Sequence, residues 1–230
     1  MSAVLFSGGL DSAVLLALER RDHDRVVPIH VRAGLAWEGE ERRAIDRLLA
    51  HDVFRGRVEP LQSLSLEMRD VYPATHWAVT GQPPAYDTPD EDVYLEGRNI
   101  VLIAKAAVLC SRLGIGRLAL GPLAGNPFPD ATTAFFESMS RSVSLGLARS
   151  LSIATPLAHL HKEDVVRLGA TLRVPLALTL SCMNPADGKH CGRCSKCRER
   201  HDGFVAAGIE DPTIYFSVPG LRGSGGSVVR

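Results

Sequence analysis

The stretch Phe6-Ser7-Gly8-Gly9-Leu10-Asp11-Ser12 follows an apolar run, Ala3 to Phe6, and opens a segment of helical character, Asp11 to Arg20. Two adjacent glycines allow a sharp turn and bring bare backbone N–H groups toward a ligand. These amides and the positive end of the following helix suit a phosphate group. The stretch therefore predicts a strand, a phosphate-binding loop and a helix.

Polar side chains add to this loop, because Ser7 and Ser12 supply hydroxyl donors and Asp11 is placed to hold a magnesium ion. The loop is neither a Walker A motif nor a dinucleotide-binding Gly-x-Gly-x-x-Gly. A plain turn in which Asp11 only caps the helix is the alternative. The order Ser-Gly-Gly-x-Asp-Ser resembles the PP-loop of the ATP pyrophosphatases, a doubly wound α/β group. There the loop binds pyrophosphate while AMP is transferred to a substrate oxygen.

Outside the loop, strand-like apolar runs alternate with helical stretches, as in a parallel sheet covered on both faces. Strands are expected at Ala3–Phe6, Val26–Val31, Val58–Leu61, Arg117–Leu120 and Ser152–Ala154, and helices at Asp11–Arg20, Glu41–His51, Asn99–Leu113, Thr132–Ala148 and Lys162–Leu172. Ser65 to Tyr94 shows no steady period, which predicts a long loop with short helical pieces. The expected fold class is α/β, with a doubly wound, mainly parallel sheet and a small C-terminal zinc-binding segment.

Composition excludes several classes of protein. The 26 basic and 26 acidic residues balance, so no overall charge draws the chain to nucleic acid or to a membrane. No apolar run is long enough for a membrane-spanning helix, and the N-terminal residues lack the pattern of a signal peptide. The cytoplasm is the expected location, where cysteines indicate metal or catalytic chemistry before disulfides.

Four cysteines cluster near the C-terminus: Cys182 is followed by Cys191-Gly192-Arg193-Cys194-Ser195-Lys196-Cys197. Thiolates at these spacings predict one structural zinc ion per chain, with Cys182, Cys191, Cys194 and Cys197 as its ligands. Gly192 allows a tight knuckle in which backbone N–H groups point at a sulfur. An iron–sulfur cluster and a redox or persulfide-carrying thiol pair are the alternatives. Zinc is favoured over an iron–sulfur cluster because the fourth cysteine lies upstream of the other three and no Cys-Pro pair follows them, unlike in ferredoxins.

Basic residues surround the knuckle, namely Lys189, His190, Arg193, Lys196, Arg198 and Arg200. They could contact RNA, but they also suit a solvated face that offsets the charge of four thiolates, which is the preferred interpretation. Cys110 stands apart within an apolar helix and is expected in the core.

Further segments extend the similarity to one family, that of 7-cyano-7-deazaguanine synthase. They are Glu96-Gly97-Arg98-Asn99, Phe128-Pro129-Asp130 with Phe135 downstream, Thr155-Pro156-Leu157 with Lys162 at a helix start, and Asp211-Pro212-Thr213. The resemblance spans Leu5 to about Thr213. Taken singly, each position also has a structural explanation as a helix cap, a surface residue or a core residue. The chain departs from the family pattern at Val31–Glu38 and at Ala131-Thr132.

The resemblance implies a layout and an activity. It implies an ATP-binding α/β domain over residues 1–180, a zinc-binding segment over 181–216 and a flexible tail over 217–230. ATP with Mg²⁺ would activate the carboxylate of 7-carboxy-7-deazaguanine by adenylation, and ammonia would give the amide and then the nitrile. ATP would contact the loop residues Ser7, Gly8, Gly9, Leu10, Asp11 and Ser12, together with Arg98 and Asn99.

Roles for single residues follow from the same resemblance. Asp11, Lys162 and Arg98 would be catalytic, and Phe128, Asp130 and Phe135 would bind the deazaguanine. Partners would be small molecules, with a homodimer possible and direct nucleic-acid binding not expected. An RNA-modifying or thiolating PP-loop enzyme, an enzyme with a protein-linked acceptor and a non-catalytic zinc-ribbon protein are the alternatives.

Overall fold

The computed structural model describes residues 1–219, and within them five parallel strands form one sheet. The strands are β1 (Ser2–Leu5), β2 (Val26–Arg32), β3 (Gln62–Ser65), β4 (Arg117–Ala119) and β5 (Ser152–Ala154). Their spatial order is β3-β2-β1-β4-β5, so the chain builds outward on one side of β1 and then on the other. This is the predicted doubly wound sheet, with its topological switch point between β1 and β4.

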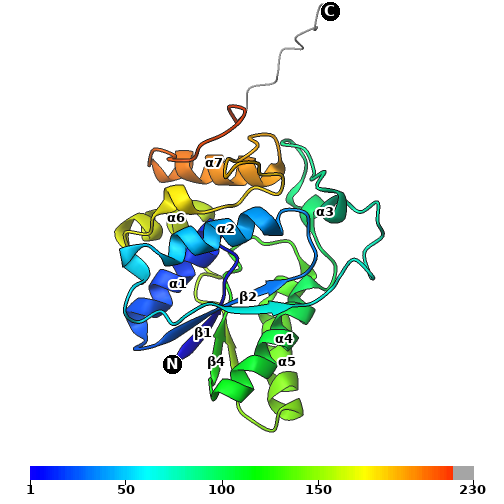
Figure 1. The fold of residues 1–230 in the computed structure, drawn as a ribbon, viewed down its shortest axis with the longest axis vertical. Helices are drawn as coiled ribbons and strands as arrows, with labels where there is room; N and C mark the ends of the chain where they lie inside the picture. The colour runs from blue at the N-terminus through cyan, green and yellow to red at the C-terminus, as the bar shows by residue number, and fades with distance from the viewer. Residues whose placement is uncertain (220–230) are drawn as a thin grey trace, which may run out of the picture.

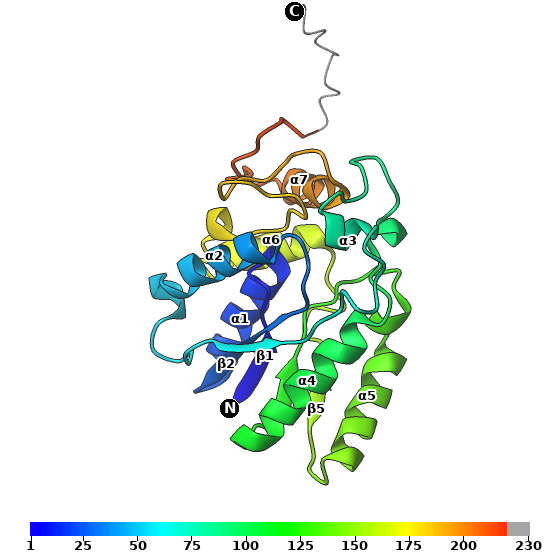
Figure 2. The same cartoon turned by 45° about the vertical axis from the view of Figure 1, so that its right-hand side comes forward.

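Helices cover both faces of the sheet (Figures 1 and 2). They are α1 (Leu10–Asp22), α2 (Glu38–Leu49), α3 (Trp77–Thr80), α4 (Arg98–Leu113), α5 (Thr133–Gly146), α6 (Lys162–Thr171) and α7 (Ser195–Ala207). Short 3-10 turns lie at Asp52–Phe54, Asp90–Val93, Pro129–Ala131 and Leu176–Leu178. Apolar side chains of α1, α2, α6 and α7 form one core, and those of α4 and α5 form another on the opposite face.

Most predicted elements are present with their ends shifted by a few residues. The predicted helix at Glu41 begins at Glu38, and the one at Thr132 begins at Thr133 with Thr132 as its N-cap. The segment after β3 is a long loop that contains only α3 and a 3-10 turn. Cys110 is fully buried in α4, as expected for a core residue.

One expected strand was misplaced, and one helix was not predicted. The strand expected at Val58–Leu61 lies four residues later, at Gln62–Ser65, and Val58 forms only an isolated bridge with Val26. Pro60 cannot donate a backbone hydrogen bond, so the ladder continues only after it. Helix α7 was not foreseen, because Gly203 and many charged residues weaken its apolar pattern.

The tail expected over residues 217–230 lies outside the described residues from Gly220 onward. Among residues 1–219, no helix has both the length and the apolar character needed to cross a membrane.

Candidate functional site

A cavity of about 300 Å³ opens at the carboxyl ends of β1, β2 and β4. Doubly wound sheets bind their ligands at this edge, beside the switch point. Eight of the residues predicted for ATP binding or catalysis line it, namely Ser7, Gly9, Leu10, Asp11, Ser12, Arg98, Asn99 and Lys162. Helix α7, which comes from the distant C-terminal part of the chain, completes the wall with Lys196, Glu199 and Arg200.

The loop between β1 and α1 is closed by its own hydrogen bonds. Ser12 donates through Oγ to the Gly9 carbonyl at 3.0 Å, and the Gly9 N–H donates to Ser7 Oγ at 3.3 Å. Gly8 has a φ of +74°, and a Cβ there would approach Ile45 Cγ1 to 2.9 Å, so only glycine fits. The turn therefore presents its backbone with little side-chain obstruction, as a phosphate site requires.

The N-terminus of α1 faces this loop without a side-chain cap. Gly9 occupies the N-cap position, and Asp11 lies inside the first turn, so the alternative role of Asp11 as an ordinary cap is not observed. Free N–H groups and the helix dipole favour an anion at this end. The loop and the helix start thus form one continuous surface whose chemistry suits an anion.

Lys162 stands at the start of α6 and reaches Asp11 across the cavity. Its Nζ lies 2.7 and 2.8 Å from the two carboxylate oxygens of Asp11 and 2.5 Å from Glu199 Oε1. Burial lowers the pKa of Lys162, but the two carboxylates outweigh burial and raise the pKa above its usual value. The group is a permanent cation beside the phosphate loop.

A second polar pair, His30 on β2 and Glu41 on α2, lines the cavity. His30 donates from Nδ1 to the Phe6 carbonyl at 3.2 Å, which leaves Nε2 as a lone-pair acceptor. Within residues 1–219, nothing hydrogen-bonds to that buried Nε2, and Glu41 Oε2 lies 3.8 Å from it. Burial lowers the pKa of His30, with Arg42 and Arg98 adding to the effect and Glu38 opposing it.

Burial raises the pKa of Glu41 to about 8, against an ordinary value of 4.5. Glu38 adds to this shift, and Arg98 opposes it. Between pH 4.5 and about pH 8 the folded protein keeps a proton on Glu41 that the unfolded chain releases. The ionisation of Glu41 therefore lowers the free energy of unfolding progressively as the pH rises through this range. At neutral pH the cavity therefore contains a protonated carboxyl group beside a neutral imidazole.

Glu41→Gln is expected to stabilise the protein, because the amide keeps the shape of the protonated acid and cannot ionise. Its free energy of unfolding should exceed that of the wild type by roughly 1–4 kcal/mol at pH 7.5. The gain should vanish near pH 4.5, where Glu41 is protonated in the folded state. Denaturant unfolding at both pH values measures it, with Glu137→Gln, a change at an exposed position of α5, as control. A gain that does not depend on pH would contradict the pKa assignment.

Arg98 and Asn99 begin α4 at the cavity edge. Arg98 is a further cation here, and within the described residues its buried Nε has no hydrogen-bond partner. The backbone N–H of Asn99 donates to Asp130 Oδ2 at 3.0 Å, and its side-chain amide donates to the Asp130 carbonyl at 2.9 Å. Asp130 therefore accepts hydrogen bonds at the start of α4. Burial raises the pKa of its carboxyl group, although the hydrogen bonds from Asn99 oppose this shift.

The three residues assigned to the deazaguanine do not line the cavity. Asp130 instead accepts hydrogen bonds from Asn99, as described above. Phe128 stacks on Tyr94, with the two ring centroids 5.2 Å apart. Phe135 packs edge-on against Phe136 within the core between α4, α5 and the sheet. Phe136 and Trp37 are aromatic residues that do reach the cavity wall.

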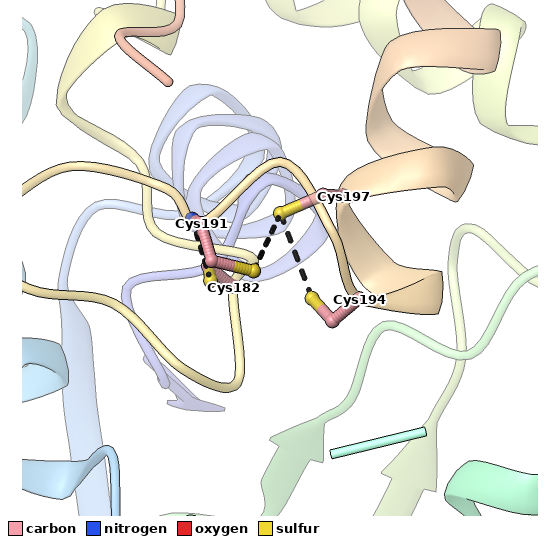
Figure 3. Close-up of side chains that lie close together, drawn as sticks. All are labelled: Cys182, Cys191, Cys194 and Cys197. Atoms are coloured by element: carbon pink, nitrogen blue, oxygen red, sulfur yellow. Dashed lines mark hydrogen bonds between the residues drawn. The ribbon is translucent and has the colours of Figure 1, made fainter. Parts of the chain in front are cut away.

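The four predicted metal ligands come together at the start of α7 (Figure 3). All four sulfur atoms lie within 4.8 Å of one another, with Cys194 and Cys197 3.5 Å apart and Cys191 and Cys197 3.9 Å apart. A tetrahedral zinc ion with Zn–S bonds of ~2.3 Å separates its sulfurs by ~3.8 Å, so the arrangement fits zinc. The four cysteines could therefore hold a metal ion.

Backbone N–H groups support thiolates in this cluster. Gly192 has a φ of +73°, and the following Arg193 N–H points at Cys191 Sγ from 3.3 Å. The N–H groups of Asn184 and Cys191 point at Cys182 Sγ from 3.3 and 3.2 Å. This is the knuckle that the sequence predicts.

Comparison with known proteins shows the family to which the chain belongs. A family model described as queuosine biosynthesis protein QueC matches residues 1–208. The chain belongs to the QueC family. A 7-cyano-7-deazaguanine synthase of Anaeromyxobacter sp. strain Fw109-5 is 35% identical over 226 residues, covering 93% of this chain and 95% of the relative. The enzyme of that name from Methanothrix thermoacetophila is also 35% identical, covering 92% of this chain and 96% of the relative.

Among solved structures, a 4-thiouridine synthetase–RNA complex with bound ATP aligns with 90% of this QueC-family chain and 52% of its own chain. The TM-score is 0.49 at 16% identity, too low to bear on function.

Sequence reasoning missed several polar residues of the cavity, among them His30, Glu41 and Glu199. It also placed Lys196 and Arg200 on a solvated face, whereas both line the cavity and Arg200 is buried. A signal for Glu41 existed, because it falls in phase with Ala44, Ile45 and Leu48 on the apolar face of its helix. An acidic residue at such a position is buried. Glu199 had no such signal, since the helix that carries it was not predicted.

Proposed function

We propose that this chain is an ATP-using 7-cyano-7-deazaguanine synthase that acts in queuosine biosynthesis. The observation that carries the proposal is the convergence of the phosphate loop, Lys162, Arg98 and Asn99 on one cavity. Membership of the QueC family and the names of its relatives support 7-cyano-7-deazaguanine as the product. The acceptor, 7-carboxy-7-deazaguanine, is the one that the sequence resemblance implies.

The reaction begins with activation of a poor electrophile. The acceptor carboxylate attacks the α-phosphorus of ATP, which forms an acyl-adenylate and releases pyrophosphate. Ammonia then attacks the acyl carbon and AMP departs, giving the amide. A second ATP then adenylates the amide oxygen and releases pyrophosphate, and loss of AMP and of both protons on the amide nitrogen leaves the nitrile.

The chain's own groups neutralise charge on the departing pyrophosphate. The backbone from Gly9 to Ser12 and the cations Lys162 and Arg98 line the side of the cavity where the phosphates would bind. Donors placed in advance stabilise such charge without reorganisation. Magnesium held by the Asp11 carboxylate would supply further charge neutralisation at the phosphates.

Zinc is proposed as the metal of the cysteine cluster, with a structural role. Four thiolates complete a tetrahedron and leave no position open to a substrate. We further propose that residues 181–216 form a zinc-binding segment on an ATP-binding domain of residues 1–180.

ATP is expected to be split to AMP and pyrophosphate, because the loop is of the PP type and lacks the Walker A lysine. Chromatography of the nucleotide products decides this, with the deazaguanine acid and ammonia present. ADP and phosphate as the main products would contradict the adenylation chemistry.

A further inference from the structure

Helix α7 begins in the cysteine cluster, and side chains of its first two turns line the cavity. Cys194 is its N-cap and Cys197 lies in its first turn, as Figure 3 shows. Glu199 follows two residues later, about 200° around the helix axis from Cys197. The same helix therefore presents cysteines on one side and a carboxylate toward the cavity on another.

One stripe of α7 faces α6 and the phosphate loop. Its members are spaced as neighbours on one helix face, namely Lys196, Glu199, Arg200 and Gly203. The first three line the cavity. Gly203 contacts the stem of Lys162, since a Cβ at that position would lie 2.3 Å from Lys162 Cγ. Only glycine lets the lysine stem cross the helix at this point.

The Lys162 ammonium lies between two carboxylates. Asp11 holds it from the loop side at 2.7 Å, and Glu199 holds it from α7 at 2.5 Å. Lys196 also forms an ion pair with Glu199, so that carboxylate has two cations of its own. The position of Lys162 is thus set from α7 as much as from the loop.

Arg200 fixes the register of α7 against the loop. It is 1% exposed and donates to the Leu176 carbonyl and to Thr179 Oγ1, both at 2.8 Å. The next residue after Thr179, Leu180, donates its N–H to the Gly8 carbonyl at 2.9 Å. One short segment therefore ties α7 to the phosphate loop.

We propose that Glu199 is a positioning residue that acts through Lys162. Glu199 holds the Lys162 ammonium beside the phosphate loop. From that position the ammonium can contact the pyrophosphate as its bond to the α-phosphorus breaks. The proposal rests on the adenylation chemistry proposed above, and on the contacts of Lys162 with α7.

Glu199→Gln keeps the shape of the side chain and removes the charge that holds Lys162. Pyrophosphate release in a single turnover should slow roughly 10-fold, while the affinity for a non-hydrolysable ATP analogue changes less than about 3-fold. Gly203→Ala should give the same signature, because its Cβ displaces the lysine stem. Asp202→Asn, an exposed carboxylate on the same helix, is the matched control and should behave as the wild type.

A double-variant cycle separates positioning from a general loss of structure. In a Lys162→Met background, Glu199→Gln should cause no further loss of rate, because the group through which it acts is gone. Equal losses in both backgrounds, or a wild-type rate in the single variant, would overturn the proposal. A wild-type protein that releases no pyrophosphate would instead refute the proposed function.

Discussion

Lys162→Met is expected to lower the rate of adenylation by about 100-fold or more while the sheet remains folded. The variant loses the cation beside the loop and leaves Asp11 and Glu199 facing each other without it. Removing a single group that stabilises transition-state charge typically costs a factor of about 10²–10³. Single-turnover release of pyrophosphate, normalised to folded protein, measures the loss.

The control for this variant is Lys105→Met, because Lys105 is an exposed lysine on α4 away from the cavity. It should keep the wild-type rate. Circular dichroism and thermal unfolding establish that the Lys162 variant is folded before its rate is compared. A rate within about 3-fold of the wild type would show that Lys162 does not act on the phosphates.

Cys197→Ser is expected to abolish metal binding and to lower stability by several kcal/mol. Cys197 is fully buried and lies within 4 Å of two other cluster sulfurs, so no neighbour can replace it. Zinc binding contributes about 10–16 kcal/mol in small zinc domains at neutral pH, and much of that free energy stabilises the fold. Elemental analysis and denaturant unfolding measure the two effects.

Cys110→Ser separates this effect from the loss of any buried thiol. Cys110 is equally buried but lies in α4, outside the cluster, so this variant should keep its zinc. A Cys197→Ser protein that retains one zinc per chain would contradict the ligand assignment. Iron in the native protein would contradict the choice of metal.

The phosphate loop and the cysteine knuckle could be predicted from sequence because each is nearly contiguous. The residues from Ser7 to Ser12 form their own turn, and those from Cys191 to Cys197 form theirs. Local backbone geometry fixes such motifs with little help from the rest of the chain. The alternation of strand-like and helical stretches could also be recognised in the sequence, and it predicted the fold class correctly.

The rest of the site depends on contacts that no local pattern encodes. Lys162 and Glu199 meet only because α6 and α7 pack together, 37 positions apart in the chain. The assignment of Phe128, Asp130 and Phe135 to the substrate came from resemblance alone. Whether Phe135 or Phe136 reaches the cavity depends on helix phase, since adjacent residues point about 100° apart.

We propose that this cavity converts a deazaguanine acid into a nitrile with the use of ATP. Mass spectrometry of the base after incubation with ATP, magnesium, ammonia and 7-carboxy-7-deazaguanine tests it most directly. We expect 7-cyano-7-deazaguanine, with the amide as a transient species and AMP as the nucleotide product. Recovery of the unchanged acid, from a folded and zinc-loaded protein that binds ATP, would contradict it.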